Sequence, residues 1–299
     1  MYRGVAVRPP SCVLLPNISR QVMAAPSRPL LVMHPNGAFR ERIRRLGGRG
    51  YACTFIHTWE QLRAEVITSP PAAILVVDPY AGVTHENPQL APDLRTLLWE
   101  FPSATVLAAV ELRPGRSRDL RTLGEWGVTD IISLAEDDTH EAIYRRLRSI
   151  EGRSLQRLLE RTLPPMLSGR TRMLMMTAAE VVAVGGKGRD LARRLHLSER
   201  TVLRWAERAG LPPPRRMLAW MRILLASSLL DDPGRSVLSV AHACGYSSDS
   251  SLRRAMQDFL GTGPSALRRE GAFPTASRVF LNELAQTRAA GRDRHSLRF

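Results

Sequence analysis

Two short segments of the chain combine arginine with hydroxyl side chains at the start of an expected helix. They are SERTVLRW (198–205) and SSDSSLRRAM (247–256). A guanidinium group can donate two parallel hydrogen bonds to guanine, and hydroxyl groups bind bases or phosphate oxygens. Both segments therefore have the chemistry to contact double-stranded DNA. The side chains expected on their outer faces are Glu199, Arg200, Thr201 and Arg204 in the first segment, and Ser248, Asp249, Ser250, Ser251, Arg253 and Arg254 in the second.

The elements that must position these side chains occur twice along the chain. DLARRLHLSERTVLRWAERAG (190–210) aligns with VLSVAHACGYSSDSSLRRAMQDFLG (237–261), and each predicts a short helix, a tight turn and a second helix opened by serine. Leu191 is expected to face a core, and Ser198 is expected to cap the helix that follows it. Gly245 suits a turn position that requires positive φ. The sequence therefore predicts two helix-turn-helix units in tandem.

The segment between the two units, RRMLAWMRILLASSLLDD (215–232), is expected to form one stiff helix. Its apolar residues have helical spacing, it has no internal proline or glycine, and Pro212, Pro213 and Pro214 precede it. Such a helix would hold the two serine-led helices at a fixed separation. Because half-sites on one face of a duplex lie roughly 34 Å apart, a single chain is expected to contact two successive major grooves.

Together these segments resemble the DNA-binding domain of the AraC/XylS family of transcription regulators. The segments that carry the resemblance are LSERTVLRW (197–205), RILLASSLL (222–230), VAHACGYSSDSSLRRA (240–255) and GTGPSALR (261–268). The resemblance implies an all-α domain with two helix-turn-helix units, sequence-specific binding to double-stranded DNA and a role in transcription regulation. Carried over position by position, it places base-reading roles on Arg200, Leu203, Arg204, Asp249, Ser250, Ser251 and Arg254.

The sequence departs from the family pattern at the first turn and in the expected core. His196 stands where glycine is usual. Smaller residues replace the usual aromatic ones at Ala206, Leu252, Met256 and Leu267. Leu203 cannot hydrogen-bond a base, although it can contact a thymine methyl group. We therefore expect the second unit to contribute more of the sequence specificity.

The charge distribution favours a nucleic-acid partner. The net charge is +15, and Lys187 is the only lysine among the 43 basic residues. Residues 187–270 carry 15 basic and 8 acidic residues, an excess of the kind that contact with phosphate requires. The alternative explanation is a generally arginine-rich, solvated surface.

Cysteine usage and hydropathy limit the other classes of function. Cys12, Cys53 and Cys244 lack metal-ligand spacing, and the sequence predicts no metal and no cofactor. This usage fits a reducing cytoplasm. No apolar run approaches the ~20 residues of a membrane span, so we expect a cytoplasmic protein without a membrane partner.

Residues 29–150 predict a separate α/β domain. Five apolar strands are expected to alternate with helices, which is typical of a parallel, doubly wound sheet. The expected strands are 30–34, 51–57, 72–78, 105–110 and 128–134. The expected helices are 39–47, one capped by Thr58, 91–101, 116–127 and 139–150.

The order and length of these elements resemble a response-regulator receiver domain, which has a flavodoxin-like sheet. Asp78 falls where receivers carry the phosphorylated aspartate. However, His34 and Pro35 replace the acidic pair that binds Mg²⁺, residues 1–150 contain no lysine, and Glu111 stands where a hydroxyl is usual. We interpret the domain as a degenerate receiver that is not phosphorylated conventionally, with Asp78 at a degenerate phosphoacceptor position. Alternatively, Asp78 is simply a turn or cap residue.

The remaining segments have weaker patterns. Residues 1–28 contain several prolines and are expected to be disordered. Residues 151–170 predict a helical connector, either a dimer-forming extension or one more packed helix. The DNA-binding domain is expected over 171–270. It is followed by a basic tail, 271–299, with an amphipathic helix at 277–288 and a solvated, frayed end.

Three hypotheses for the input and the partners remain open. The first is a DNA-binding regulator, for which RNA polymerase and a second copy, joined through the N-terminal domain or the connector, are candidate partners. The second is an enzymatic N-terminal domain with Cys53 or Cys12 as nucleophile and His34 or His57 as base. No nucleophile-elbow pattern surrounds Cys53, and no glycine-rich phosphate loop is present. The third is an N-terminal adaptor whose protein partner controls DNA binding.

Overall fold

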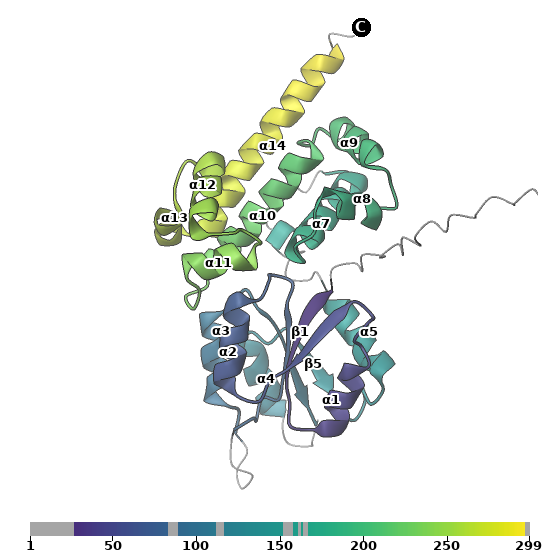
Figure 1. The fold of residues 1–299 in the computed structure, drawn as a ribbon, viewed down its shortest axis with the longest axis vertical. Coiled ribbons are helices and arrows are strands. Elements are labelled where there is room, and N and C mark those ends of the chain that lie inside the picture. The colour runs from purple at the N-terminus through teal and green to yellow at the C-terminus, as the bar shows by residue number, and fades with distance from the viewer. Residues whose placement is uncertain are drawn as a thin grey trace, which may run out of the picture.

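The computed structural model describes residues 27–82, 89–111, 117–151, 158–160, 163 and 167–296, with side chains described up to residue 289. The expected disordered segment, most of the connector and Cys12 lie outside these residues. The chain forms an N-terminal α/β domain and a C-terminal helical domain (Figure 1). No helix in the described ranges is long and apolar enough to cross a membrane.

The N-terminal domain contains a five-stranded parallel sheet. Its strands are β1 (Arg28–Met33), β2 (Tyr51–Phe55), β3 (Ile74–Val77), β4 (Thr105–Val110) and β5 (Asp130–Ser133). Every adjacent pair is parallel and the order is β2-β1-β3-β4-β5. This is the flavodoxin-like order, and the predicted α/β fold is confirmed. β2 is two residues shorter than predicted, and β3 and β5 are each three residues shorter. β4 begins and ends where the sequence predicted, and β1 begins two residues earlier and ends one residue earlier.

Helices cover both faces of the sheet. They are α1 (Gly37–Arg44), α2 (Trp59–Thr68), α3 (Pro92–Glu100), α4 (Ser117–Trp126) and α5 (His140–Ile150). Apolar residues of α2, α3 and α4 pack on one face, and those of α1 and α5 pack on the other (Figure 1). Asn36 and Thr58 cap α1 and α2 by accepting hydrogen bonds from the amides of Phe39 and Gln61, at 3.0 and 3.2 Å.

The C-terminal domain is entirely helical in its described part. Its helices are α7 (Gly169–Ala183), α8 (Gly188–Arg194), α9 (Glu199–Arg208), α10 (Pro214–Leu230), α11 (Val237–Ala243), α12 (Asp249–Leu260), α13 (Pro264–Glu270) and α14 (Ala272–Ser296). They share one hydrophobic core around α10. Trp220 of α10 is fully buried, with the rings of Phe259 and Phe280 at 4.9 and 5.3 Å. Gly185, just after the end of α7, has a left-handed backbone with φ of 77°, which is common where a helix stops.

The C-terminal helix is longer than predicted. Helix α14 begins five residues before the predicted amphipathic helix and runs to Ser296. Ala276, Phe280 and Leu284 recur every four residues and are buried against the rest of the domain. The carboxylate of Asp231 accepts hydrogen bonds from the first two amides of α14, at 2.7 and 2.9 Å. These contacts make α14 part of the domain core.

Candidate nucleic-acid interface

The first helix-turn-helix unit is formed by α8 and α9. Leu191 and Ala192 of α8 face the core, and Val202 and Ala206 of α9 are buried against them. The turn passes through His196, which has a left-handed backbone with φ of 54°. Ser198 caps α9 by accepting a hydrogen bond from the Thr201 amide at 3.1 Å, as predicted.

The outer face of α9 carries the side chains expected to read bases. Arg200 and Arg204 are exposed, and Leu203 is 38% exposed, which is unusual for a leucine in this protein. Thr201 is half-buried, and its hydroxyl lies 2.8 Å from the hydroxyl of Ser198. Three of the four predicted residues in this unit are therefore open to a ligand, whereas Thr201 already takes part in the helix cap.

The second unit repeats this geometry in α11 and α12. Gly245 has φ of 75°, which confirms the predicted positive value. The amide of Tyr246 donates to the Ala241 carbonyl at 2.8 Å. Leu252 and Met256 are fully buried on the inner face of α12, so these smaller residues keep the core role of the aromatic ones.

On the outer face of α12, Ser250, Arg253 and Arg254 are exposed. Arg253 pairs with Asp249 at 3.3 Å, one helical turn away. Ser251 is half-buried in a capping box: its hydroxyl donates to the Ser248 carbonyl at 2.7 Å and accepts from the Ser248 amide at 3.2 Å. The spacing of Ser248 and Ser251, three residues apart in the sequence, is the pattern that could have predicted this cap. Ser250 and Arg254 are the better placed of the predicted contacts.

Helix α10 joins the two units rigidly. It has 17 residues and would span about 25 Å at the usual rise of an α-helix. Most of its length is buried, and α9 and α12 lie on opposite sides of it (Figure 1). Because both units pack on the same core, their separation is fixed by the fold. The predicted stiff spacer is confirmed.

A basic groove lies between the first unit and α10. Its volume is about 910 Å³, and Glu199 is its one acidic lining residue. The cations that line it are Lys187, Arg189, Arg200, Arg215 and Arg222. The sequence analysis named only Arg200 as a contact, although the excess of basic residues over 187–270 pointed to this part of the chain. The groove extends the positively charged surface beyond α9 and α12.

The groove cations are available to an anionic ligand. Within the described residues, none of these five side chains forms a salt bridge, whereas Arg193, Arg216 and Arg253 pair with acidic residues. The guanidinium of Arg222 lies 6.0 Å from the centre of the Tyr246 ring in the second unit. Arg222 therefore connects the groove with the turn before α12.

His34 and Asp78 lie at the carboxyl edge of the N-terminal sheet, and each bonds to a nearby backbone amide. His34 is buried, its Nδ1 accepts a hydrogen bond from the Asn36 amide at 3.1 Å, and burial lowers the pKa of its imidazole. Asp78 Oδ1 accepts from the Tyr80 amide at 2.9 Å, the geometry of a turn residue. Within the described residues no group of three or more His, Cys, Asp and Glu side chains is arranged to hold a metal ion.

Burial raises the pKa of both described cysteine thiols. Cys53 is half-buried, its thiol lies 3.6 Å from the Ile43 carbonyl oxygen, and burial raises its pKa. Cys244 is buried directly after α11, and burial raises its pKa to about 12. Because the thiolate is the reactive form, both sites disfavour covalent catalysis at neutral pH.

Comparisons with known proteins agree with the helical domain. Residues 191–270 match a protein-family model described as a helix-turn-helix domain. The sequence has no match among curated proteins.

Three solved structures show weak similarity. Full-length FixJ from B. japonicum is 14% identical over 77% of this chain and 96% of its own, with a TM-score of 0.30. The xylose-binding transcription activator XylR is 14% identical over 83% and 71%, with a TM-score of 0.35. The response regulator StyR is 15% identical over 64% and 96%, with a TM-score of 0.26. TM-scores this low do not support conclusions about function.

Proposed function

From an AraC-type helix-turn-helix domain at residues 191–270, we infer that this protein is a DNA-binding transcription regulator. The observation that carries this inference is the pair of arginine-bearing helices, α9 and α12, which one rigid core presents beside a groove lined by five cations. Sequence reading requires exposed donors on a rigid element, and phosphate binding requires cations without acidic partners. The C-terminal domain has both.

In the proposed complex, α9 and α12 enter two successive major grooves of one duplex. Arg200, Arg204 and Arg254 donate hydrogen bonds to guanine O6 and N7, and Leu203 contacts a thymine methyl group. Ser250 bonds a base or a phosphate oxygen. The other cations of the basic groove bind the phosphates beside the first half-site and neutralise their charge; they are Lys187, Arg189, Arg215 and Arg222.

The N-terminal domain supplies the input, and we propose that this input is not conventional phosphorylation. The buried His34 provides no carboxylate for Mg²⁺, and Asp78 holds the turn at Tyr80. A protein partner that binds this domain and thereby controls DNA binding fits the same observations. A second copy of the chain and RNA polymerase remain candidate partners. An enzymatic role is the less favoured alternative, because burial raises the pKa of Cys53.

Selection of duplexes from a random-oligonucleotide library by the purified full chain tests the function. The expected product is one enriched sequence with two half-sites whose centres lie about one helical turn, 10–10.5 base pairs, apart. Scrambling either half-site should weaken binding, and scrambling both should reduce it to the level of unrelated DNA. Recovery of a random population would contradict the proposed function.

A further inference from the structure

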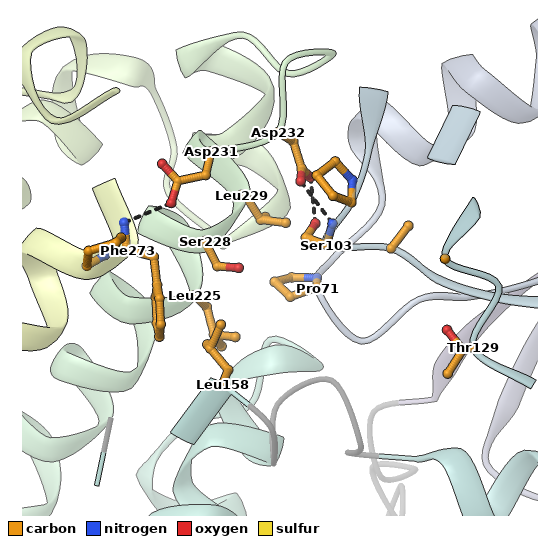
Figure 2. Close-up of a pocket in the computed structure, with 14 residues that line it drawn as sticks. Pro71, Ser103, Thr129, Leu158, Leu225, Ser228, Leu229, Asp231, Asp232 and Phe273 are labelled. Carbon is orange, nitrogen blue, oxygen red and sulfur yellow. Dashed lines mark hydrogen bonds between the residues drawn. The ribbon is translucent and has the colours of Figure 1, made fainter. Parts of the chain in front are cut away.

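The two domains meet at the amino-terminal edge of the sheet, opposite the edge that carries Asp78. Residues 231–236, here called the α10–α11 loop, form part of this contact. Its Gly234 amide donates to the Glu100 carbonyl at 3.0 Å. Asp232 accepts from the amide and the hydroxyl of Ser103, at 3.0 and 2.5 Å (Figure 2). A cavity of about 460 Å³, lined by residues of both domains, lies beside this contact (Figure 2).

A buried ion pair fixes the loop from within. Asp232 and Arg235 are 1% and 4% exposed and lie 3.1 Å apart. Arg235 also donates to the Ile67 carbonyl at the end of α2, at 2.8 Å, and lies 5.7 Å from the centre of the Phe101 ring. A buried charge pair is stable only when its remaining donors and acceptors are satisfied, and here the N-terminal domain supplies those partners.

Gly234 fits the contact because it has no side chain. A Cβ atom at this position would lie 2.6 and 2.7 Å from Cζ and Cε1 of Phe101, and 3.1 Å from Cβ of Glu100. Its backbone is not among the positive-φ glycines of the chain, so its own conformation does not require glycine. The three atoms that a Cβ would meet first all belong to the N-terminal domain. The close approach of the two domains therefore explains why glycine occupies this position.

The loop leads directly into the second helix-turn-helix unit. Ser236 caps α11 by accepting a hydrogen bond from the Ser239 amide at 3.1 Å, and α11 packs against α12. Helix α11 also contacts α2 of the N-terminal domain. Ser250 and Arg254 remain exposed in this arrangement. The contact therefore restrains the second unit without covering its outer face.

We propose that the α10–α11 loop is an intramolecular docking element through which the N-terminal domain orders the second helix-turn-helix unit and so sets its affinity for DNA. The proposal rests on the proposed function. A unit that is ordered before binding loses less conformational entropy on the duplex than a unit that is free to move. A signal that loosens the docking would weaken the second half-site and leave the first unchanged.

Two variants of the full chain test the docking from opposite sides. Gly234→Ala introduces the clash with Phe101, and Ser103→Ala removes the hydroxyl donor to Asp232. Gly263→Ala is the matched control, because a Cβ there meets nothing within 4 Å. Hydrogen exchange of peptides 99–104 and 231–236 should be about tenfold faster in Gly234→Ala and raised less in Ser103→Ala. Gly263→Ala should exchange as the unmodified protein does.

Footprints on the selected duplex test the consequence for DNA binding. Both variants should lower the apparent affinity at the half-site of α12 by about threefold to tenfold and leave that of α9 unchanged. Unchanged exchange in Gly234→Ala would overturn the docking, and equal losses at both half-sites would overturn the selective coupling. A chain that selected no duplex would contradict the proposed function and this coupling together. Exchange alone would then decide whether the domains dock.

Discussion

His196 and Gly245 occupy the same left-handed position in the turns of the two helix-turn-helix units, with φ of 54° and 75°. A Cβ in this left-handed conformation strains the folded state by roughly 1–2 kcal/mol. Glycine avoids this strain, but it loses more conformational entropy on folding, which offsets part of the gain. We therefore expect His196→Gly to raise the free energy of unfolding of the C-terminal domain by about 0.5–1 kcal/mol. Urea denaturation measures this as a higher midpoint at unchanged slope.

Gly245→Ala is the matched comparison, because a Cβ at Gly245 has open space and adds only backbone strain. It should lower the free energy of unfolding by about 1 kcal/mol. If His196→Gly left the midpoint unchanged or lowered it, the side chain of His196 would have to make a stabilising contact that offsets the strain.

Arg204 and Arg254 occupy corresponding positions on the exposed faces of α9 and α12. Replacing either with alanine should weaken binding to the selected duplex by roughly 1–3 kcal/mol and relax the base preference at one position. Arg208→Ala is the control, since this exposed arginine lies at the last turn of α9, away from the end that contacts bases. Titrations on selected and unrelated duplexes measure the effect. Losses of similar size on both would show that Arg204 and Arg254 contact phosphate only.

Arg215 lines the basic groove but lies outside the recognition helices. Its expected role is phosphate contact, so Arg215→Ala should weaken binding to all duplexes equally and reduce the slope of log K against log salt by about 1. Arg95→Ala removes the same charge from an exposed site on α3 in the N-terminal domain and should leave the slope unchanged. If Arg215→Ala and Arg95→Ala gave the same slope of log K against log salt, Arg215 would not contact a phosphate.

Phe280 connects α14 to the centre of the C-terminal domain through its contact with Trp220 at 5.3 Å. Because the ring is 1% exposed, Phe280→Ala should lower the free energy of unfolding by about 3–5 kcal/mol. Arg278→Ala, on the exposed face of the same helix, should change it by less than about 0.5 kcal/mol. A small effect of Phe280→Ala would show that α14 adds little to the stability of the domain core.

Local patterns predicted most of the fold. Apolar strands alternating with helices led to the sheet, and Ser198 and Gly245 marked the turns because capping and positive φ depend on single residue types. The basic groove was not predictable in the same way. Lys187 precedes α8 and Arg215 lies in α10, so only tertiary packing brings them together.

The domain contact was missed for a related reason. Asp232 ends the expected spacer and Arg235 follows it, and neither residue was expected to be buried, yet both are. Their burial depends on Ser103, which lies far away in the chain. Helix α14 was only partly predicted. The four-residue spacing of Ala276, Phe280 and Leu284 gives a helix, but its burial depends on the surface that α10 provides.

Asp78 provides the last prediction, because it has the position of a phosphoacceptor without the neighbours that the reaction needs. Incubation with acetyl phosphate and Mg²⁺ should leave the protein without an added phosphoryl group. The reason is that His34 stands where a receiver has an acidic ligand for Mg²⁺, and that Asp78 Oδ1 accepts a hydrogen bond from the Tyr80 amide at 2.9 Å. Intact-protein mass spectrometry measures the modification, and Asp78→Asn is the control. A phosphoryl group that appears in the unmodified sequence and not in Asp78→Asn would show that this edge of the sheet is a working receiver site.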